Sequence, residues 1–149
     1  MDLILWRHAE AQEWTPGCDD MARRLTSRGE KQAKRMAGWL DRQLPDNTRI
    51  LVSPAVRAEQ TAGALGRKFK IKPELAPDAT VAQLLELVQW PHAKGTVLVV
   101  GHQPTLGQTI AELIGLQSSE CPVKKGAAWW LHQRQQETLV LAVQSAELL

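Results

Sequence analysis

The feature that most constrains the fold of this chain is the apolar run Leu3–Trp6, which ends abruptly in the polar pair Arg7-His8. A short apolar run of this kind is typical of a strand that is buried on both faces of a parallel sheet. Sheets of that type bind their ligands beyond the carboxyl ends of the strands. Arg7 and His8 therefore stand where a ligand is expected, with a guanidinium to hold an anion and a ring nitrogen to attack it.

Strand-like and helix-like patterns alternate along the chain. Strands are predicted over residues 2–6, 49–52 and 96–100, and two more, 127–132 and 138–143, flank a polar turn at an expected sheet edge. Apolar residues recur at helical spacing in four segments that begin near Ser27, Ser53, Thr80 and Leu106, the second of them extending through Leu65 and Phe69. This alternation predicts a three-layer α/β/α sandwich whose central sheet is mostly parallel, with an antiparallel edge.

Three of the predicted helices carry a start signal. Ser27 with Glu30, and Thr80 with Gln83, resemble capping boxes, in which two side chains satisfy free N–H groups of the first turn. Ser53, which a proline follows, resembles a hydroxyl cap, and we expect a cap rather than a nucleophile at this position.

Composition narrows the class of protein. The 149 residues are 44% hydrophobic and 23% charged, which is ordinary for a globular protein, and they suffice for one domain over residues 1–149. A net charge of +2 gives no reason to expect nucleic acid or a membrane surface as a partner. No apolar run approaches the roughly 20 residues of a membrane span, and nothing resembles a signal peptide. We expect a cytoplasmic protein, monomeric by default.

Two further polar segments follow predicted strands. Arg57 lies in the first turn of the helix after the second strand, and His102 follows Gly101 at the end of the third. If these strands are parallel neighbours, both side chains converge with Arg7 and His8 at one end of the sheet. Helix amino termini at the same end would add free N–H groups and partial positive charge. The pattern predicts a concave, cationic site for a phosphoryl group.

The chemistry of such a site follows from its charges. A phosphoryl group carries roughly −1.5 to −2 charge at neutral pH, and each of two arginines can bind its oxygens in bidentate fashion. The same cations lower the pKa of a nearby histidine and so keep a nucleophilic His8 neutral. His102 is then expected to donate a hydrogen bond to the phosphoryl oxygens. This chemistry needs no metal or organic cofactor, and the two cysteines form no metal-binding spacing.

At this level of detail the chain resembles the histidine phosphatase superfamily, also called phosphoglycerate-mutase-like. The matching blocks are Arg7-His8, Leu25-Thr26 with Gly29, Gln32 and Ala33, the segment Ser53–Ala62, and Gly101-His102. The short chain and the residues of the Ser53–Ala62 segment most resemble those of SixA-type phosphohistidine phosphatases, which are members of this superfamily. The resemblance extends from residue 2 to about residue 115.

The resemblance implies a role for each matching residue. His8 would be the nucleophile that becomes phosphorylated, and Arg7, Arg57 and His102 would form the phosphate pocket. Arg23 matches an arginine that lines the pocket in SixA-type members, although Arg24 stands directly beside it.

The acidic proton donor of mutases and phosphoester phosphatases has no clear equivalent here. Asp78 and Glu86 lie in the relevant region, but neither has a convincing context. Expulsion of an alkoxide requires a proton, since its conjugate acid has a pKa near that of water, about 15.7. A protonated phosphoimidazole instead leaves as imidazole, whose conjugate acid has a pKa of roughly 6.5. The sequence therefore favours a phosphatase for phosphohistidine on a signalling protein, such as a histidine phosphotransfer domain.

Two alternatives remain open from the sequence. One is a phosphatase for small phosphoesters, and the other is a non-catalytic module that binds phosphate for regulation. Retention of His8 argues against the second, since binding alone needs only the arginines and His102.

Other conspicuous residues receive structural interpretations. His92 and His132 are expected at the surface. Trp129 and Trp130 must point to opposite faces of their strand, so that one of them could be exposed.

Overall fold

The computed structural model describes residues 1–149, in which six strands form one sheet in the order β3-β2-β4-β1-β5-β6. The strands are β1 (Asp2–Arg7), β2 (Arg49–Val52), β3 (Lys70–Ile71), β4 (Thr96–Gly101), β5 (Ala128–Arg134) and β6 (Glu137–Gln144). The helices are α1 (Ser27–Gln43), α2 (Val56–Gly63), α3 (Val81–Val88) and α4 (Thr105–Ile114), with short 3-10 turns η1 (Asp20–Ala22), η2 (Pro73–Leu75) and η3 (Ala146–Leu148). None of the helices is long and apolar enough to cross a membrane.

The strands that carry the predicted site residues are parallel neighbours. β4 lies between β1 and β2 and runs parallel to both, and Arg7 stands opposite Gly101 in the register. β5 and β6 continue the sheet in antiparallel fashion on the other side of β1. The predicted mixed sheet with an antiparallel edge is confirmed.

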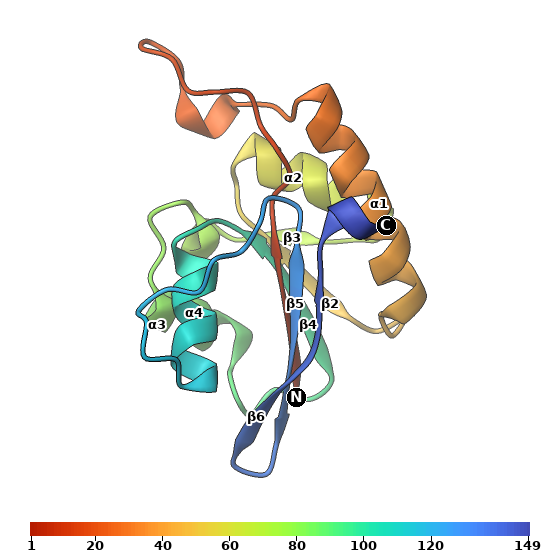
Figure 1. The fold of residues 1–149 in the computed structure, drawn as a ribbon, viewed down its shortest axis with the longest axis vertical. Helices are drawn as coiled ribbons and strands as arrows, with labels where there is room; N and C mark the ends of the chain where they lie inside the picture. Colours follow the sequence, from red (N-terminus) through yellow and green to blue (C-terminus); the bar gives the residue numbers. More distant parts are fainter.

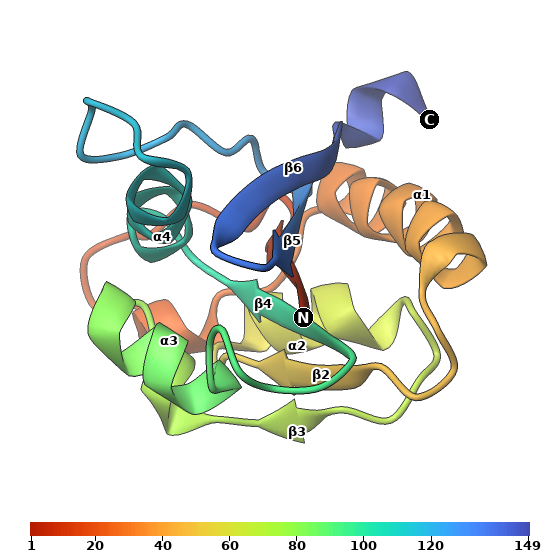
Figure 2. The same cartoon turned by 90° about the horizontal axis from the view of Figure 1, so that it is seen from below.

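Alternation along β1 divides the core between the two faces of the sheet. Ile4 and Trp6 pack with residues of α1 and α2, whereas Leu3 and Leu5 pack with residues of α3 and α4. Figures 1 and 2 show the same two pairs of helices on opposite faces of the sheet. A strand covered on both sides has no polar face, which explains the unbroken apolar run at the start of the chain.

Two helix starts differ from the sequence prediction. The cap of α1 is Thr26, whose hydroxyl accepts the N–H of Gly29 at 2.9 Å, rather than Ser27. α2 begins at Val56 without a side-chain cap, so that the capping role expected of Ser53 was wrong. At α3 the predicted capping box of Thr80 and Gln83 is confirmed.

The region after α2 was also predicted incompletely. α2 ends at Gly63, so Leu65 and Phe69 lie beyond it, although both still contribute to the core on that face. The edge strand β3 was missed because it has only two residues, both exposed, and therefore no apolar run. Trp129 and Trp130 do face opposite cores, and both are half-buried.

Candidate active site

The residues singled out in the sequence meet at the carboxyl ends of the parallel strands. Arg7 is the last residue of β1 and His8 follows it, His102 follows β4, and Arg57 lies in the first turn of α2. They line a cavity of about 270 Å³ whose nine lining residues are Arg7, His8, Ala11, Arg23, Arg57, Pro77, His102, Gln103 and Lys125. The structure thus brings together every residue predicted for the site.

The tautomer of His8 follows from one hydrogen bond. The side chain is buried, and its Nδ1 lies 2.7 Å from the carbonyl oxygen of Ala9. A carbonyl oxygen only accepts hydrogen bonds, so Nδ1 carries the proton and Nε2 carries the lone pair. The ring nitrogen with nucleophilic character is therefore the one that this contact leaves free.

The surroundings of His8 keep it neutral. Burial lowers the pKa of His8 to about 4, and the charges of Arg57 and Arg7 lower it as well, against the opposing effect of the Ala9 hydrogen bond. The imidazole is accordingly uncharged at pH 7, as a nucleophile must be.

The ring of His102 is oriented by Ser53, which we interpreted from the sequence as a helix cap. Its Nε2 lies 2.7 Å from Oγ of Ser53, and that oxygen also accepts the N–H of Ala55 at 3.2 Å. With the hydroxyl proton of Ser53 assigned to the contact with Nε2, the ring proton of His102 lies on Nδ1. Burial lowers the pKa of His102 to about 3, with further lowering from His8 and Arg57. The neutral ring thus presents an N–H donor.

Several buried donors of the site have no partner. They are Nε of Arg7, Nε of Arg57 and Nδ1 of His102. Buried polar groups are nearly always hydrogen-bonded in folded proteins, and unpaired ones point to a missing ligand or to function. All three belong to side chains that line the cavity, where an oxyanion supplies acceptors of the right charge.

The two arginines are held by other parts of the chain. Nη1 of Arg7 donates to the carbonyl oxygen of Val123 at 2.7 Å. Arg57 binds Asp20 twice, with Nη1 on its carbonyl oxygen at 2.7 Å and Nη2 on its carboxylate at 3.1 Å. Each guanidinium is thereby fixed on one side while its Nε stays unpaired.

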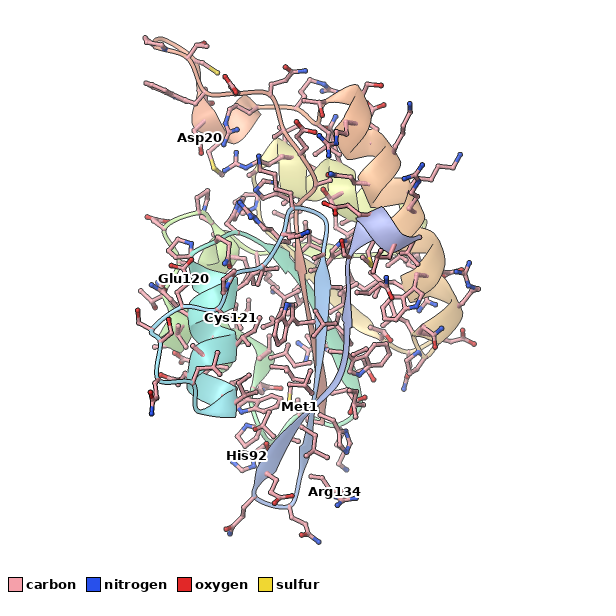
Figure 3. All side chains as sticks on the ribbon, viewed as in Figure 1. Met1, Asp20, His92, Glu120, Cys121 and Arg134 are labelled. Carbon is pink, nitrogen blue, oxygen red and sulfur yellow. The ribbon has the colours of Figure 1, made fainter.

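Asp20 also binds Arg23 and was not recognised in the sequence. Its carboxylate accepts from Nε of Arg23 at 2.8 Å. Burial acts in the opposite direction, but the hydrogen bond from Arg23 and the charge of Arg57 hold the pKa of Asp20 below its ordinary value. Arg23 therefore occupies the position expected of a pocket arginine, whereas Arg24 is exposed. Figure 3 shows Asp20 at the end of the molecule where β1 ends.

Side chains of the sequence motifs fix the loop that follows His8. Thr61 accepts the N–H of Ala9 at 3.0 Å and donates to the carbonyl oxygen of Arg57 at 2.7 Å. Gln32 accepts the N–H of Glu10 at 3.0 Å. These contacts give a structural role to Thr61 and Gln32, two residues of the sequence blocks identified above.

The close contact between α1 and the loop after His8 requires a glycine at position 29. A Cβ at this position would lie 1.9 Å from the carbonyl oxygen of Glu10. Only glycine lets the first turn of α1 approach the loop so closely.

No carboxylate is among the nine cavity-lining residues. Asp78 follows the lining residue Pro77 but is exposed, and Glu86 on α3 is exposed as well. Glu120 lies near the site, where its carboxylate is 3.4 Å from Nε2 of Gln103. The structure contains no cluster of three or more His, Cys, Asp or Glu side chains placed to hold a metal ion.

Lys125 also lines the cavity, although the sequence analysis did not place it in the site. It precedes Gly126, whose N–H donates to the carbonyl oxygens of Arg7 and His8 at 3.2 and 3.1 Å. This chain reversal before β5 places Lys125 in the wall of the cavity, and no local pattern in the sequence predicts it. Of the histidines expected at the surface, His92 is exposed at the opposite end of the molecule in Figure 3. The other, His132, is half-buried and bonded to Asp2.

Comparison with known proteins gives consistent results. Residues 3–80 match the family model of the histidine phosphatase superfamily (branch 1). The phosphohistidine phosphatase SixA of Escherichia coli is 34% identical over 121 residues, which cover 76% of this chain and 74% of that protein. A SixA homolog of Haemophilus influenzae is 32% identical over 130 residues, with 77% and 78% covered. The structure of the protein histidine phosphatase SixA complexed with tungstate superimposes with a TM-score of 0.79 at 29% identity, covering 98% of this chain and 97% of that one.

Proposed function

The chain belongs to the histidine phosphatase superfamily, and from that premise we propose that it removes the phosphoryl group from phosphohistidine on a protein, with His8 as the nucleophile. The observation that carries this proposal is the state of His8, which is neutral with a free Nε2 in a cavity lined by Arg7, the buried Arg57 and His102. We further propose that residues 1–149 form one domain that contains the whole site.

The first step is transfer of the phosphoryl group to the enzyme. Nε2 of His8 attacks phosphorus and forms a P–N bond, while the P–N bond of the substrate breaks and its imidazole leaves with a proton taken from solvent. Arg7 and Arg57 hold the phosphoryl oxygens in place, and Nδ1 of His102 donates to one of them. Phosphoryl transfer depends mostly on positioning and electrostatics, which these donors supply.

The second step restores the enzyme. Water attacks the phosphorus of phospho-His8, the P–N bond breaks, and its electron pair returns to Nε2, while the protons of the water stay on the phosphate or pass to solvent. Inorganic phosphate leaves, and His8 is neutral again because its depressed pKa disfavours the imidazolium.

The absence of a carboxylate among the lining residues supports phosphohistidine as the substrate. An imidazole leaving group with a conjugate-acid pKa of roughly 6.5 can take its proton from solvent at neutral pH, whereas an alkoxide needs a dedicated acid. A histidine phosphotransfer domain of a signalling pathway is the kind of partner that carries such a group. The free state of Cys18 and Cys121 favours a reducing compartment, the cytoplasm, for this reaction.

The test compares two kinds of substrate and three forms of the enzyme. A histidine phosphotransfer domain phosphorylated on histidine and a panel of small phosphoesters are offered to the wild type, to His8→Ala and to His92→Ala. We expect the wild type and His92→Ala to release phosphate from the phosphohistidine protein, with His8→Ala inactive. The phosphoenzyme should be labile in acid and stable in base, as phosphohistidine is.

Each part of the proposal can fail separately. A phosphoenzyme that forms unchanged in His8→Ala would refute the nucleophile. Rapid hydrolysis of phosphoesters together with no action on phosphohistidine would refute the substrate and favour a small-molecule phosphatase. Tight phosphate binding without any turnover would favour a regulatory module.

A further inference from the structure

Trp14 is unusual among the six tryptophans of the chain because it is 55% exposed, whereas the other five are buried or half-buried. It belongs to residues 12–19, which we call the rim loop, between β1 and η1. Figure 1 shows the chain after β1 projecting beyond the end of the sheet at which the active site lies. Trp14 thus belongs to a loop that extends from the active-site end of the molecule.

The base of the rim loop is part of the cavity wall. Ala11 and Arg23 lie on either side of the rim loop in the sequence, and both line the cavity. An isolated antiparallel bridge between Ala11 and Leu25 joins the segments that flank the loop. Nη1 of Arg23 donates to the carbonyl oxygen of Gln12 at 2.6 Å. The residues on either side of the rim loop therefore border the cavity.

Hydrogen bonds within the rim loop hold Trp14 in place. Its indole Nε1 donates to the carbonyl oxygen of Cys18 at 3.0 Å, and the N–H of Cys18 donates to Thr15 at 2.9 Å. Since the indole nitrogen is already paired, the exposed part of the ring offers apolar surface only. An anchor that is ordered before binding loses little entropy when a partner covers it.

We propose that Trp14 is a docking anchor for the protein that carries the phosphohistidine. This inference rests on the proposed function. The side chain of histidine has only two rotatable bonds, so a protein whose phosphohistidine enters the cavity must lay its own surface against the rim. Tryptophan is among the residues most enriched at the energetic centres of protein interfaces, where a buried aromatic side chain stabilises the complex. Trp14 itself is not among the cavity-lining residues, so we expect a small substrate held in the cavity not to contact it.

The experiment measures kcat/KM for two substrates that contain the same P–N bond. One is a histidine phosphotransfer domain phosphorylated on histidine, and the other is free phosphohistidine. The enzymes are the wild type, Trp14→Ala, Trp14→Phe and the control Leu141→Ala. Leu141 has the same exposed fraction, 55%, but lies on the edge strand β6. Circular dichroism of each variant verifies that it is folded.

We expect Trp14→Ala to lose tenfold or more in kcat/KM on the phosphorylated domain, mainly through KM, and to stay within twofold of the wild type on free phosphohistidine. Trp14→Phe should recover most of the loss, and Leu141→Ala should match the wild type on both substrates.

Three results would overturn the inference. Equal losses on both substrates would mean that Trp14 shapes the pocket, and no loss on either would mean that Trp14 is not contacted. A wild type that acts on free phosphohistidine or phosphoesters but not on the phosphorylated domain would refute the protein substrate itself, and with it the docking anchor.

Discussion

The hydroxyl oxygen of Ser53 lies 2.7 Å from Nε2 of His102, so the direction of this hydrogen bond decides which nitrogen of His102 carries the proton. The serine stands at the end of β2 and the histidine at the end of β4, two strands that are adjacent in the sheet. A residue that resembles a helix cap in the sequence thus contacts, in the fold, the histidine that we propose as a phosphate-binding group.

Ser53→Ala should lower activity without removing any group that touches the phosphoryl group. A net hydrogen bond is worth about 1 kcal/mol, which corresponds to roughly a fivefold loss of kcat/KM on free phosphohistidine. In a His102→Asn background the same substitution should have little further effect, because both changes act through one donor. The exposed Ser118 provides the control variant Ser118→Ala. Additive losses would show that Ser53 acts independently of His102.

Asp20→Asn should weaken both the fold and the site. The substitution removes the charge that compensates Arg57, whose side chain is only 4% exposed. Because the carboxylate itself is 42% exposed, we expect a loss of about 1 kcal/mol in the free energy of unfolding, measured with urea. We also expect a severalfold loss of kcat/KM, since Arg57 and Arg23 lose their shared carboxylate while Arg57 keeps only its contact with the backbone carbonyl oxygen of residue 20.

Asp41→Asn is the matched control for that prediction. Asp41 pairs with Nε of Arg67 at 2.9 Å in a similar geometry on the surface. Its substitution should cost less than about 0.5 kcal/mol and leave activity unchanged. Equal effects of the two substitutions would show that Asp20 has no special role.

Two glycines of α1 should respond to alanine in opposite directions. Gly29→Ala places a Cβ 1.9 Å from a backbone oxygen and should destabilise the protein by about 1–3 kcal/mol. Gly38→Ala meets only the end of the Arg42 side chain at 3.7 Å and should stabilise by up to about 1 kcal/mol through helix propensity. Urea unfolding at pH 7 measures both, and a neutral Gly29→Ala would contradict the close approach of α1 to the loop.

Stability should fall as the pH decreases below about 6.5. In the unfolded chain both site histidines bind protons near pH 6.5, whereas in the folded protein His8 does so at about pH 4 and His102 at about pH 3. Between about pH 6.5 and about pH 4 the unfolded state binds more protons than the folded state. The free energy of unfolding therefore rises with pH in this range and falls on acidification.

The slope of stability between pH 7 and pH 4.5 should therefore be smaller in His8→Asn and in His102→Asn than in the wild type. The exposed His92 gives the control His92→Asn, whose slope should equal that of the wild type. Identical slopes for all four proteins would show that the site histidines are not held neutral by burial.

Most of the sheet was predictable because strands that are buried on both faces have a continuous apolar sequence. β1 and β4 are covered on both faces and read as continuous apolar runs, and the capping box of α3 was recognised from Thr80 and Gln83 alone. β3 has no such apolar run because its two residues are exposed. The cap of α1 was misplaced by one residue because Thr26 and Ser27 are both good capping residues in adjacent positions.

By itself the sequence predicted which residues meet in the candidate site, because Arg7, His8, Arg57 and His102 each follow a strand signal and parallel strands end at one edge. Only the tertiary structure decided how these groups are held. The contact of Arg57 with Asp20 spans 37 residues and that of His102 with Ser53 spans 49, and neither follows a helical or strand period. Periodicity reports which side of an element is buried, whereas hydrogen bonds between distant segments depend on how the elements pack. The proposed donor role of His102 depends on its contact with Ser53, whereas the tautomer of His8 is set locally by the carbonyl oxygen of Ala9.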